Sequence, residues 1–288
     1  MNRSCGWCGF RRRDRYTLPM VILGHGSDVS LAPTITPIVS VVGGSVRKAM
    51  STLAEEGFPA VQLDAALRGI RPRELNRTGR RDLITAAARA GVRLAGIDLF
   101  VPQKHLLSDE HVDRAVSAIV EAVRLAGDLG RIPLSLTLPL EQSAEEAVAA
   151  ILEAADGHGV ALAIHAERDI DSAGEAIDRL NDQGVGLGLD PATLLLQGRD
   201  AVEAAQKLGP RLTSARLSDA DRDLGQRTVV GRGDLDVAGY RVGVDLATRR
   251  VGPVVLDLRS LQGPLAALRE GMKAWEDAAF SLGSQPPR

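Results

Sequence analysis

Chemically active side chains stand at the ends of several short apolar runs in this sequence. Asp190 follows one such run, residues 184–189, and precedes a proline. His165 and Glu167 follow another. An imidazole beside a carboxylate is a typical general acid–base pair, and the same groups can ligate a cation. By position alone, Asp190 can equally be the N-cap of the next helix.

Polar side chains also follow the other apolar runs. In parallel α/β folds the carboxyl ends of the strands meet at one face, and ligands bind there. Strands that leave a core must become polar somewhere, so part of this pattern needs no functional explanation. The further residues are Gln62, Asp64, Asp98, Arg216, Ser218, Asp219, Asp257 and Arg259, with His105 in a loop after residue 100.

The segments that would position these side chains alternate between apolar runs and amphipathic stretches. Many of the runs are continuously apolar, as buried parallel strands are. Eight strand–helix pairs from residue 37 onward predict a (β/α)8 TIM barrel, whose usual length is ~250 residues. A doubly wound sheet is the rival, but no Gly-x-Gly-x-x-Gly turn follows the first run. The predicted strands lie at residues 38–42, 60–63, 92–100, 132–138, 160–164, 184–189, 211–217 and 253–256.

The domain organisation follows from the same alternation. We expect one barrel domain at residues 34–281, an irregular extension at 1–33 and a disordered tail at 282–288. Cys5 and Cys8 are the only cysteines, and they fall in the extension. A redox pair would follow a strand and open a helix, and a zinc site would need two more ligands nearby, so neither is predicted.

Composition excludes several classes of function. The chain has 288 residues, of which 25% are charged and 3% aromatic, and its net charge is −2. This balance argues against a nucleic-acid partner and against attraction to an anionic membrane. The sequence contains no apolar run of about 18 residues, the length that would predict a membrane span. We therefore expect a cytoplasmic protein with no nucleic-acid or membrane partner.

Five motifs occur in a recognisable order over most of the chain. They are EGFPAVQL at 56–63, AGDLG at 126–130, GLDP at 188–191, ARLSD at 215–219 and GRGDLD at 231–236. In this order they resemble the xylose isomerase-like TIM barrels, which include sugar phosphate isomerases and epimerases and the family-2 abasic-site endonucleases. The resemblance implies proton transfer next to the carbonyl of a sugar or sugar phosphate.

The resemblance also implies a set of metal ligands. The family typically places a Glu at the end of strand five, an Asp after strand six, a His in strand seven and a Glu after strand eight. Here these positions carry His165, Asp190, Arg216 and Asp257. Asp190, His165 and Asp257 could still hold Mn, Mg, Co or Zn. A guanidinium cannot ligate a cation, so Arg216 favours a metal-free site in which it pairs with Asp190 or Asp257, or binds a substrate anion.

Two functions remain as hypotheses. The first is a sugar or sugar-phosphate isomerase or epimerase with a degenerate metal site, and a homo-oligomer is compatible with it. The alternative is a non-catalytic barrel that binds a sugar or an anion or serves as an assembly partner. An abasic-site nuclease is disfavoured, because it needs several metal ions and a basic surface. The predicted catalytic residues are His165, Asp257 and Glu167, and the predicted substrate-binding residues are Arg216, Arg227, Gln62 and His105.

Overall fold

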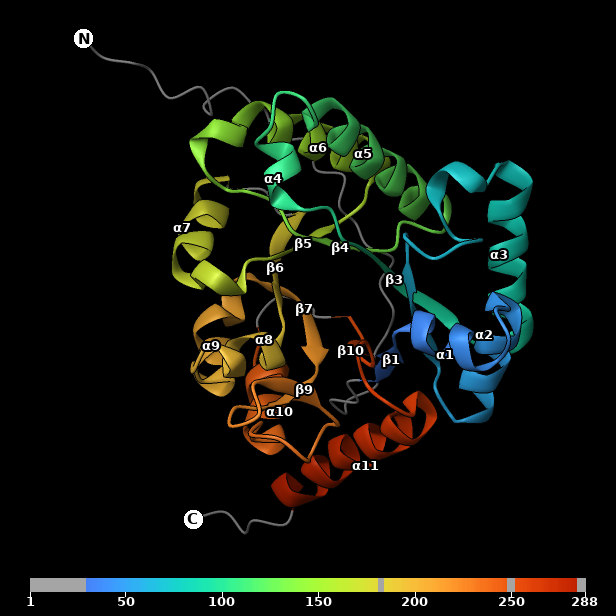
Figure 1. Cartoon of the computed structure of the whole chain (residues 1–288), viewed down its shortest axis with the longest axis vertical. Helices are drawn as coiled ribbons and strands as arrows, with labels where there is room; N and C mark the ends of the chain where they lie inside the picture. The colour runs from blue at the N-terminus through green and yellow to red at the C-terminus, as the bar shows by residue number, and fades with distance from the viewer. Residues whose placement is uncertain (1–29, 181–183, 248–251, 284–288) are drawn as a thin grey trace.

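The computed structural model describes residues 30–180, 184–247 and 252–283. Within them, parallel strands form a ring that helices surround (Figure 1), which confirms the predicted (β/α)8 barrel. The strands of the ring are β1 (Leu31–Pro33), β2 (Ala60–Asp64), β3 (Arg93–Leu99), β4 (Leu134–Leu136), β5 (Leu162–His165), β6 (Val185–Leu189), β7 (Leu212–Leu217) and β10 (Val254–Leu256).

Hydrogen bonds join these strands into one sheet that nearly closes on itself. The order is β1-β10-β7-β6-β5-β4-β3-β2, and every pair is parallel. A parallel bridge between Thr34 and Gln62 brings the two edges together beside β1 and β2. Because all strands run the same way, their carboxyl ends converge on one face of the barrel.

Helices cover the outside of the ring (Figure 1). They are α1 (Ile35–Val41), α2 (Val46–Glu55), α3 (Arg77–Ala90), α4 (Gln103–Leu106), α5 (Val112–Asp128), α6 (Glu145–His158), α7 (Ile170–Leu180), α8 (Pro191–Leu196), α9 (Ala201–Leu208), α10 (Val237–Asp245) and α11 (Pro264–Gly283). Short 3₁₀ turns lie at η1 (Pro72–Glu74), η2 (Gln142–Ala144), η3 (Glu167–Asp169) and η4 (Gly209–Arg211).

Local sequence signals set several helix ends. The hydroxyl of Ser45 accepts from the backbone N–H of Lys48 at 3.2 Å and so caps α2. Gly91 and Gly159 end α3 and α6 in the left-handed conformation, with φ of 77° and 65°. A residue without a Cβ adopts this conformation at little cost, which is why glycine is common there.

The first predicted strand is wrong. Residues 38–42 belong mostly to α1, and the first strand of the ring is β1, so the barrel begins at Leu31 rather than at residue 34. The buried side chains of α1 are Ile35, Ile38 and Val39, which share one helical face. Packing of this face against the core outweighs the preference of its β-branched residues for strands.

A two-stranded hairpin at the carboxyl end of the barrel was not predicted. It consists of β8 (Asp219–Asp221) and β9 (Gln226–Thr228), which pair in antiparallel fashion. The ten residues at 219–228 are mostly polar and show no apolar alternation, so the sequence carries no strand signal there. This hairpin matters because it supplies one residue of the site described below.

The glycines of β6 make room for neighbouring side chains inside the barrel. A Cβ atom at Gly186 would lie 2.2 Å from Cγ2 of Thr213 and 2.8 Å from the carbonyl oxygen of Arg211. A Cβ at Gly188 would lie 2.3 Å from Nε2 of His165. These glycines are therefore required by close approach rather than by backbone conformation.

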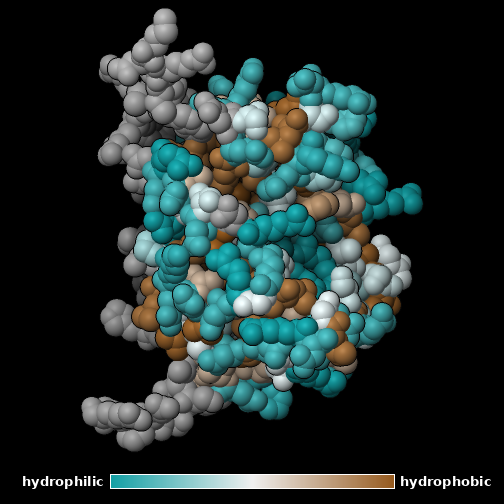
Figure 2. Space-filling model, turned by 60° about the vertical axis from the view of Figure 1, so that its left-hand side comes forward, coloured by the Kyte–Doolittle hydropathy of each residue, from teal (hydrophilic) through white to brown (hydrophobic). Residues whose placement is uncertain are grey.

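On the face shown in Figure 2, hydrophilic side chains predominate and hydrophobic ones form separate patches. None of the helices in the described ranges has the length and apolar character needed to cross a bilayer. Residues 1–29 and 284–288, and with them Cys5, Cys8 and most of the predicted extension and tail, lie outside the described residues.

Gly186→Ala is expected to lower the free energy of unfolding by ~1–3 kcal/mol, because the added methyl group overpacks the barrel interior. Gly157→Ala is the matched control: this α6 glycine has nothing within 4 Å of a built Cβ. In a helix this change should raise stability by up to ~1 kcal/mol. Urea denaturation of both variants measures the difference. Equal stability of the two would contradict the packing argument.

Candidate functional site

Charged side chains of opposite sign meet at the carboxyl end of the barrel. Three carboxylates and three guanidiniums form one set of ion pairs, which we call the mouth network. They come from β3, β7, β9 and the segments that follow β6 and β10. The members of the mouth network are Asp98, Asp190, Asp257, Arg216, Arg227 and Arg259.

Arg216 of β7 contacts all three carboxylates. Its Nη2 donates to Oδ1 of Asp98 at 2.7 Å. Its Nη1 lies 3.5 Å from Oδ2 of Asp190 and 3.9 Å from Oδ2 of Asp257. The guanidinium therefore stands among the carboxylates, where the family resemblance implies a histidine ligand.

Arg227 reaches the mouth network from the hairpin. Its Nη2 donates to Oδ2 of Asp190, and its Nη1 donates to Oδ2 of Asp257 at 3.2 Å. Arg227 thus bridges two of the three residues predicted to hold a metal. The single positive charge of this guanidinium offsets part of the charge of both carboxylates, and it persists at every accessible pH.

Arg259 links two strands that are not neighbours in the sheet. Its Nε and Nη2 atoms donate to the two oxygens of Asp257 at 2.8 and 2.6 Å. Its Nη1 donates to Oδ2 of Asp98 at 2.5 Å. The bidentate pair with Asp257 is the strongest kind of charge-assisted hydrogen bond in the mouth network.

The carboxylates of Asp190 and Asp257 are buried and remain charged. The side chains of Asp257 and Asp190 are 0% and 4% exposed. Burial raises the pKa of Asp257, but hydrogen bonds and charge from Arg259, with Arg216 and Arg227, outweigh it and hold that pKa well below its usual range. Burial also raises the pKa of Asp190, and Arg227 and Arg216 again bring the net shift downward.

Asp190 occupies the N-cap position of α8, yet it does not cap the helix with its side chain. The hydroxyl of Ser218 accepts from the backbone N–H of Ala192 at 3.1 Å instead. The same hydroxyl donates to Oδ1 of Asp190 at 2.6 Å. This arrangement favours the reading of Asp190 as a site carboxylate, and it leaves Oδ2 for the guanidiniums of Arg227 and Arg216.

Asp219 holds the base of the hairpin. Its buried carboxylate accepts the backbone N–H groups of Ala220, Gly231, Gly233 and Leu235 at 2.8–3.0 Å. Burial raises the pKa of this carboxyl, although the four hydrogen bonds oppose the shift. These hydrogen bonds hold residues 231–235 against β8 and so fix the hairpin at the carboxyl end of the barrel.

His165 and Glu167 form a second polar group inside the barrel. Nδ1 of His165 and Oε1 of Glu167 are 2.7 Å apart, and both residues are buried. The ring lies over Gly188 of the adjacent strand, where a Cβ would overlap it. Nε2 of His165 is buried and has no hydrogen-bond partner in the described part of the chain. A buried imidazole nitrogen without a partner is costly, which makes it a candidate for contact with a ligand.

A buried tyrosine supports β7 from the outer side. The hydroxyl of Tyr240, in α10, donates to the carbonyl oxygen of Arg216 at 2.8 Å. Burial raises the pKa of Tyr240 well above its usual value, and the charges of Asp190 and Glu167 add to the shift. Tyr240 is therefore a neutral donor that fixes the backbone at Arg216.

The remaining predicted residues lie apart from the mouth network. Gln62 is buried inside the barrel, where its Oε1 lies over Gly96 of β3. His105 lies in α4, and its ring meets that of His111 edge-on at a centroid distance of 5.1 Å. Among the described residues, neither Gln62 nor His105 is hydrogen-bonded or ion-paired to the mouth network. Their predicted role in substrate binding stays a prediction.

Asp98 and Arg259 belong to the site, although neither was among the residues predicted to act in it. Both follow apolar runs and so carried the same positional signal as Asp257. Their membership of the site shows only in the structure, where the guanidinium of Arg259 donates both to Asp257 and to Asp98. Sequence position alone does not give that geometry.

The predicted metal ligands do not fit a divalent cation as arranged here. Both oxygens of Asp257 accept from guanidinium groups, and the oxygens of Asp190 accept from Ser218 and from arginines. Within the described ranges, no three His, Cys, Asp or Glu side chains are grouped so as to hold a metal. Three guanidiniums already balance three carboxylates, so no net negative charge remains to attract a further cation.

The family model described as "Xylose isomerase-like TIM barrel" matches residues 50–278, which is most of the chain. This chain belongs to the xylose isomerase-like TIM barrel family. The match confirms the resemblance inferred from the motifs.

Solved structures of the same fold include several xylose isomerase-like proteins. An L-ribulose 3-epimerase superposes with a TM-score of 0.70 at 14% identity, covering 90% of this chain and 99% of its own. A xylose isomerase domain protein from Planctomyces limnophilus has a TM-score of 0.68 at 19% identity, and the match covers 88% of this chain and 96% of that protein. A D-psicose 3-epimerase from Clostridium cellulolyticum H10, solved with D-tagatose, has a TM-score of 0.64 at 13% identity. The match covers 82% of this chain and 92% of that protein.

These structures establish the fold alone, because their sequences are too distant to carry the site. A comparison with curated proteins finds no match. The chemistry of this family member must therefore be argued from its own side chains.

Replacement of Arg227 should destabilise the protein in a pH-dependent way. Arg227→Gln leaves two buried carboxylates with one fewer cation. We expect the free energy of unfolding at pH 7 to fall by about 2–4 kcal/mol, since removal of one partner from a fully buried ion pair costs ~3–5 kcal/mol. The pKa values of Asp190 and Asp257 lie below 3.8 in the folded state. Their contribution is therefore complete above about pH 5 and is lost as the pH falls below about 4.

Urea denaturation between pH 7 and pH 3 measures this effect. The difference between the wild type and Arg227→Gln should shrink as the pH falls. Arg232→Gln is the control, because Arg232 pairs with Glu270 at an exposed site and should change stability by ~1 kcal/mol or less. A constant difference from pH 7 to pH 3 would show that Arg227 does not act through these carboxylates.

Divalent cations should leave the wild-type melting temperature unchanged. A metal at 100 times its Kd would stabilise by ~2.7 kcal/mol, which is readily measured as a shift in melting temperature. Melting temperatures of the wild type measured in EDTA and in MnCl2 test whether a metal binds. The combined variant Arg216→His and Arg227→Ala removes two cations and adds an imidazole, so it should gain stability with Mn²⁺. A manganese response of the wild type alone would overturn the argument from the mouth network.

Proposed function

We propose that this protein is a metal-independent member of its family that isomerises a sugar or sugar phosphate by moving a proton next to a carbonyl. The observation that carries the proposal is the buried Nε2 of His165, which has no partner in the described structure while Nδ1 is held by Glu167. The structural neighbours named as epimerases support a sugar as the class of substrate.

His165 is the proposed general base. Glu167 orients the imidazole at 2.7 Å and favours the tautomer with the proton on Nδ1, so that Nε2 carries a lone pair. This lone pair can remove a proton from the carbon next to the substrate carbonyl. The resulting imidazolium is stabilised by Glu167 and can return the proton to the neighbouring carbon. The isomerisation is complete when a proton also passes from the adjacent hydroxyl to the former carbonyl oxygen of the substrate.

The guanidiniums of the mouth network supply the proposed electrostatic assistance. Proton removal places negative charge on the substrate oxygens, and fixed N–H donors stabilise such charge without reorganisation. Arg227 and Arg259 are the most exposed cations of the network, at 21% and 34% of their side chains. Since His165 is only 4% exposed, side chains at the mouth must move before a substrate contacts Nε2.

The site favours isomerisation over epimerisation. One base can transfer a proton between neighbouring carbons on the same face of an enediolate. Inversion at one carbon needs a second acid–base group on the opposite face. Asp257, the predicted partner, has a strongly lowered pKa and both oxygens occupied by arginines, so it is a poor proton donor. We assign it an electrostatic role and keep His165 and Glu167 for proton transfer.

Deuterium exchange tests this function directly. Wild-type protein incubated with aldoses, ketoses and their phosphates in D2O should introduce deuterium beside the carbonyl, as measured by NMR. His165→Ala should reduce the rate by about 10²–10⁴-fold, the usual contribution of a general base. Glu167→Gln should reduce it less and shift its pH profile, because it acts through the imidazole.

His158→Ala is the control for loss of a histidine. His158 lies in the last turn of α6, is exposed and is remote from the mouth network. Its replacement should leave the exchange rate unchanged. Exchange that persists in His165→Ala would show that another residue is the base. EDTA should have no effect in either case.

The alternative is a non-catalytic barrel that binds a sugar or an anion. It is favoured by one observation, that each guanidinium of the mouth network is already paired with carboxylates. In this case sugars or phosphate should raise the melting temperature while no substrate of the panel exchanges deuterium. Measured exchange on any sugar would exclude it.

A further inference from the structure

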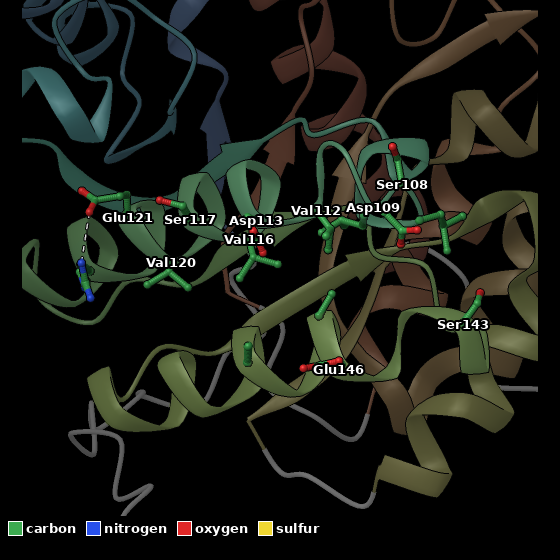
Figure 3. Close-up of a pocket in the computed structure, with 15 residues that line it drawn as sticks. Ser108, Asp109, Val112, Asp113, Val116, Ser117, Val120, Glu121, Ser143 and Glu146 are labelled. Carbon is green, nitrogen blue, oxygen red and sulfur yellow. Dashed lines mark hydrogen bonds and ion pairs between the residues drawn. The ribbon is translucent and has the colours of Figure 1, made fainter.

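A groove on the outer wall of the barrel lies between α5 and α6, away from the mouth network. Its volume is about 530 Å³, and the segment after α4 closes one end. Figure 3 shows that the labelled valines of α5 lie in a row along the groove, with Glu146 of α6 on its other side. Such a space between two helices is suited to a peptide segment.

The wall formed by α5 is apolar and partly exposed. Val112, Val116 and Val120 are spaced four residues apart and so form one stripe along the helix. Each is half-buried. Leu107 adds a side chain that is 42% exposed at the closed end. Apolar area of this kind gains free energy when another side chain covers it.

The rim of the groove is acidic. Four carboxylates and one guanidinium line it, which leaves three negative charges. Arg124 pairs with Glu121 at 3.1 Å. The carboxylates of Asp109, Asp113 and Glu146 have no ion pair with any described residue. A binding segment should therefore combine basic and apolar side chains.

Residues 1–29 of this chain have that composition. They contain five arginines and two aspartates, so their side chains carry a net charge of +3. They also contain Trp7, Phe10 and Tyr16, which are three of the eight aromatic residues of the chain. The charge complements the three unbalanced negative charges of the groove, and the aromatic rings complement its valine stripe.

The length of this segment allows it to reach the groove. It joins the barrel at β1, and 29 extended residues span up to about 100 Å. The 17 residues of α5 are only ~26 Å long. The segment is thus long enough to pass around the barrel and still lie along α5.

We propose that residues 1–29 bind in the groove between α5 and α6 of the same chain. Arginines of the segment pair with Asp109, Asp113 and Glu146, and its aromatic side chains cover the valine stripe. The segment thereby becomes part of the barrel wall beside the carboxyl ends of β3 and β4.

The cysteines make the test possible in the full chain. Cys5 and Cys8 are the only cysteines and both lie in the proposed segment. A thiol-reactive nitroxide attached to them broadens NMR signals of nearby methyl groups until the label is reduced. We expect loss of signal intensity for the methyl groups of Val112, Val116 and Val120, and none for Leu265 in α11.

Charge reversal provides matched variants. Asp113→Lys with Glu146→Lys should abolish the broadening, because it reverses the rim charge. Asp82→Lys with Glu153→Lys changes the net charge equally at exposed positions outside the groove, and should leave the broadening intact. Broadening that spreads evenly over the surface, or that survives reversal at the rim, would overturn the proposal.

A mixing experiment identifies the chain that provides the segment. Isotope-labelled protein with Cys5→Ser and Cys8→Ser is mixed with unlabelled, nitroxide-carrying protein. No broadening of the groove valines is expected in the mixture. Broadening there would assign the occupant to a second copy and overturn the intramolecular arrangement.

Discussion

The ion pairs of the mouth network are the interaction on which the site depends. Removing a carboxylate or a guanidinium from water costs several kcal/mol, and only close partners repay it. Asp257 is fully buried, yet it stays ionised because Arg259 and Arg227 donate to both of its oxygens. The rest of the local structure serves this balance: Ser218 completes the shell of Asp190, and Asp219 holds the hairpin that supplies Arg227.

The chemistry proposed for His165 depends equally on the absence of a side chain at Gly188, which lies beside its ring. Gly188 has no side chain, so the imidazole can lie across β6 and direct Nε2 into the barrel. The same strand ends at Leu189, directly before Asp190, so one short segment supplies both the space for the proposed base and a carboxylate for the cations. The proposed proton transfer and its electrostatic support thus depend on positions only two residues apart.

The sequence predicted the barrel because its signals are local and repeated. Continuous apolar runs placed most strands within a few residues, and the strand ends pointed to His165, Asp190 and Asp257. The hairpin was missed because a polar strand has no hydrophobic pattern, and α1 was misassigned because tertiary packing overrode its β-branched residues. The ion pairs joining Asp98 to Arg259 across 161 positions depend on barrel closure, which no local pattern encodes.

The bridging position of Arg227 constrains how this site could change over evolutionary time. A histidine in place of Arg216 alone would leave Arg227 between Asp190 and Asp257, so no cation could enter. Loss of Arg227 alone would leave buried carboxylates short of charge before any metal-binding residue was present. Each single step is therefore unfavourable, and a metal site here would require coordinated changes in β7 and in the hairpin. The charge balance of the mouth network thus resists single substitutions, because each one leaves a buried charge without its partner.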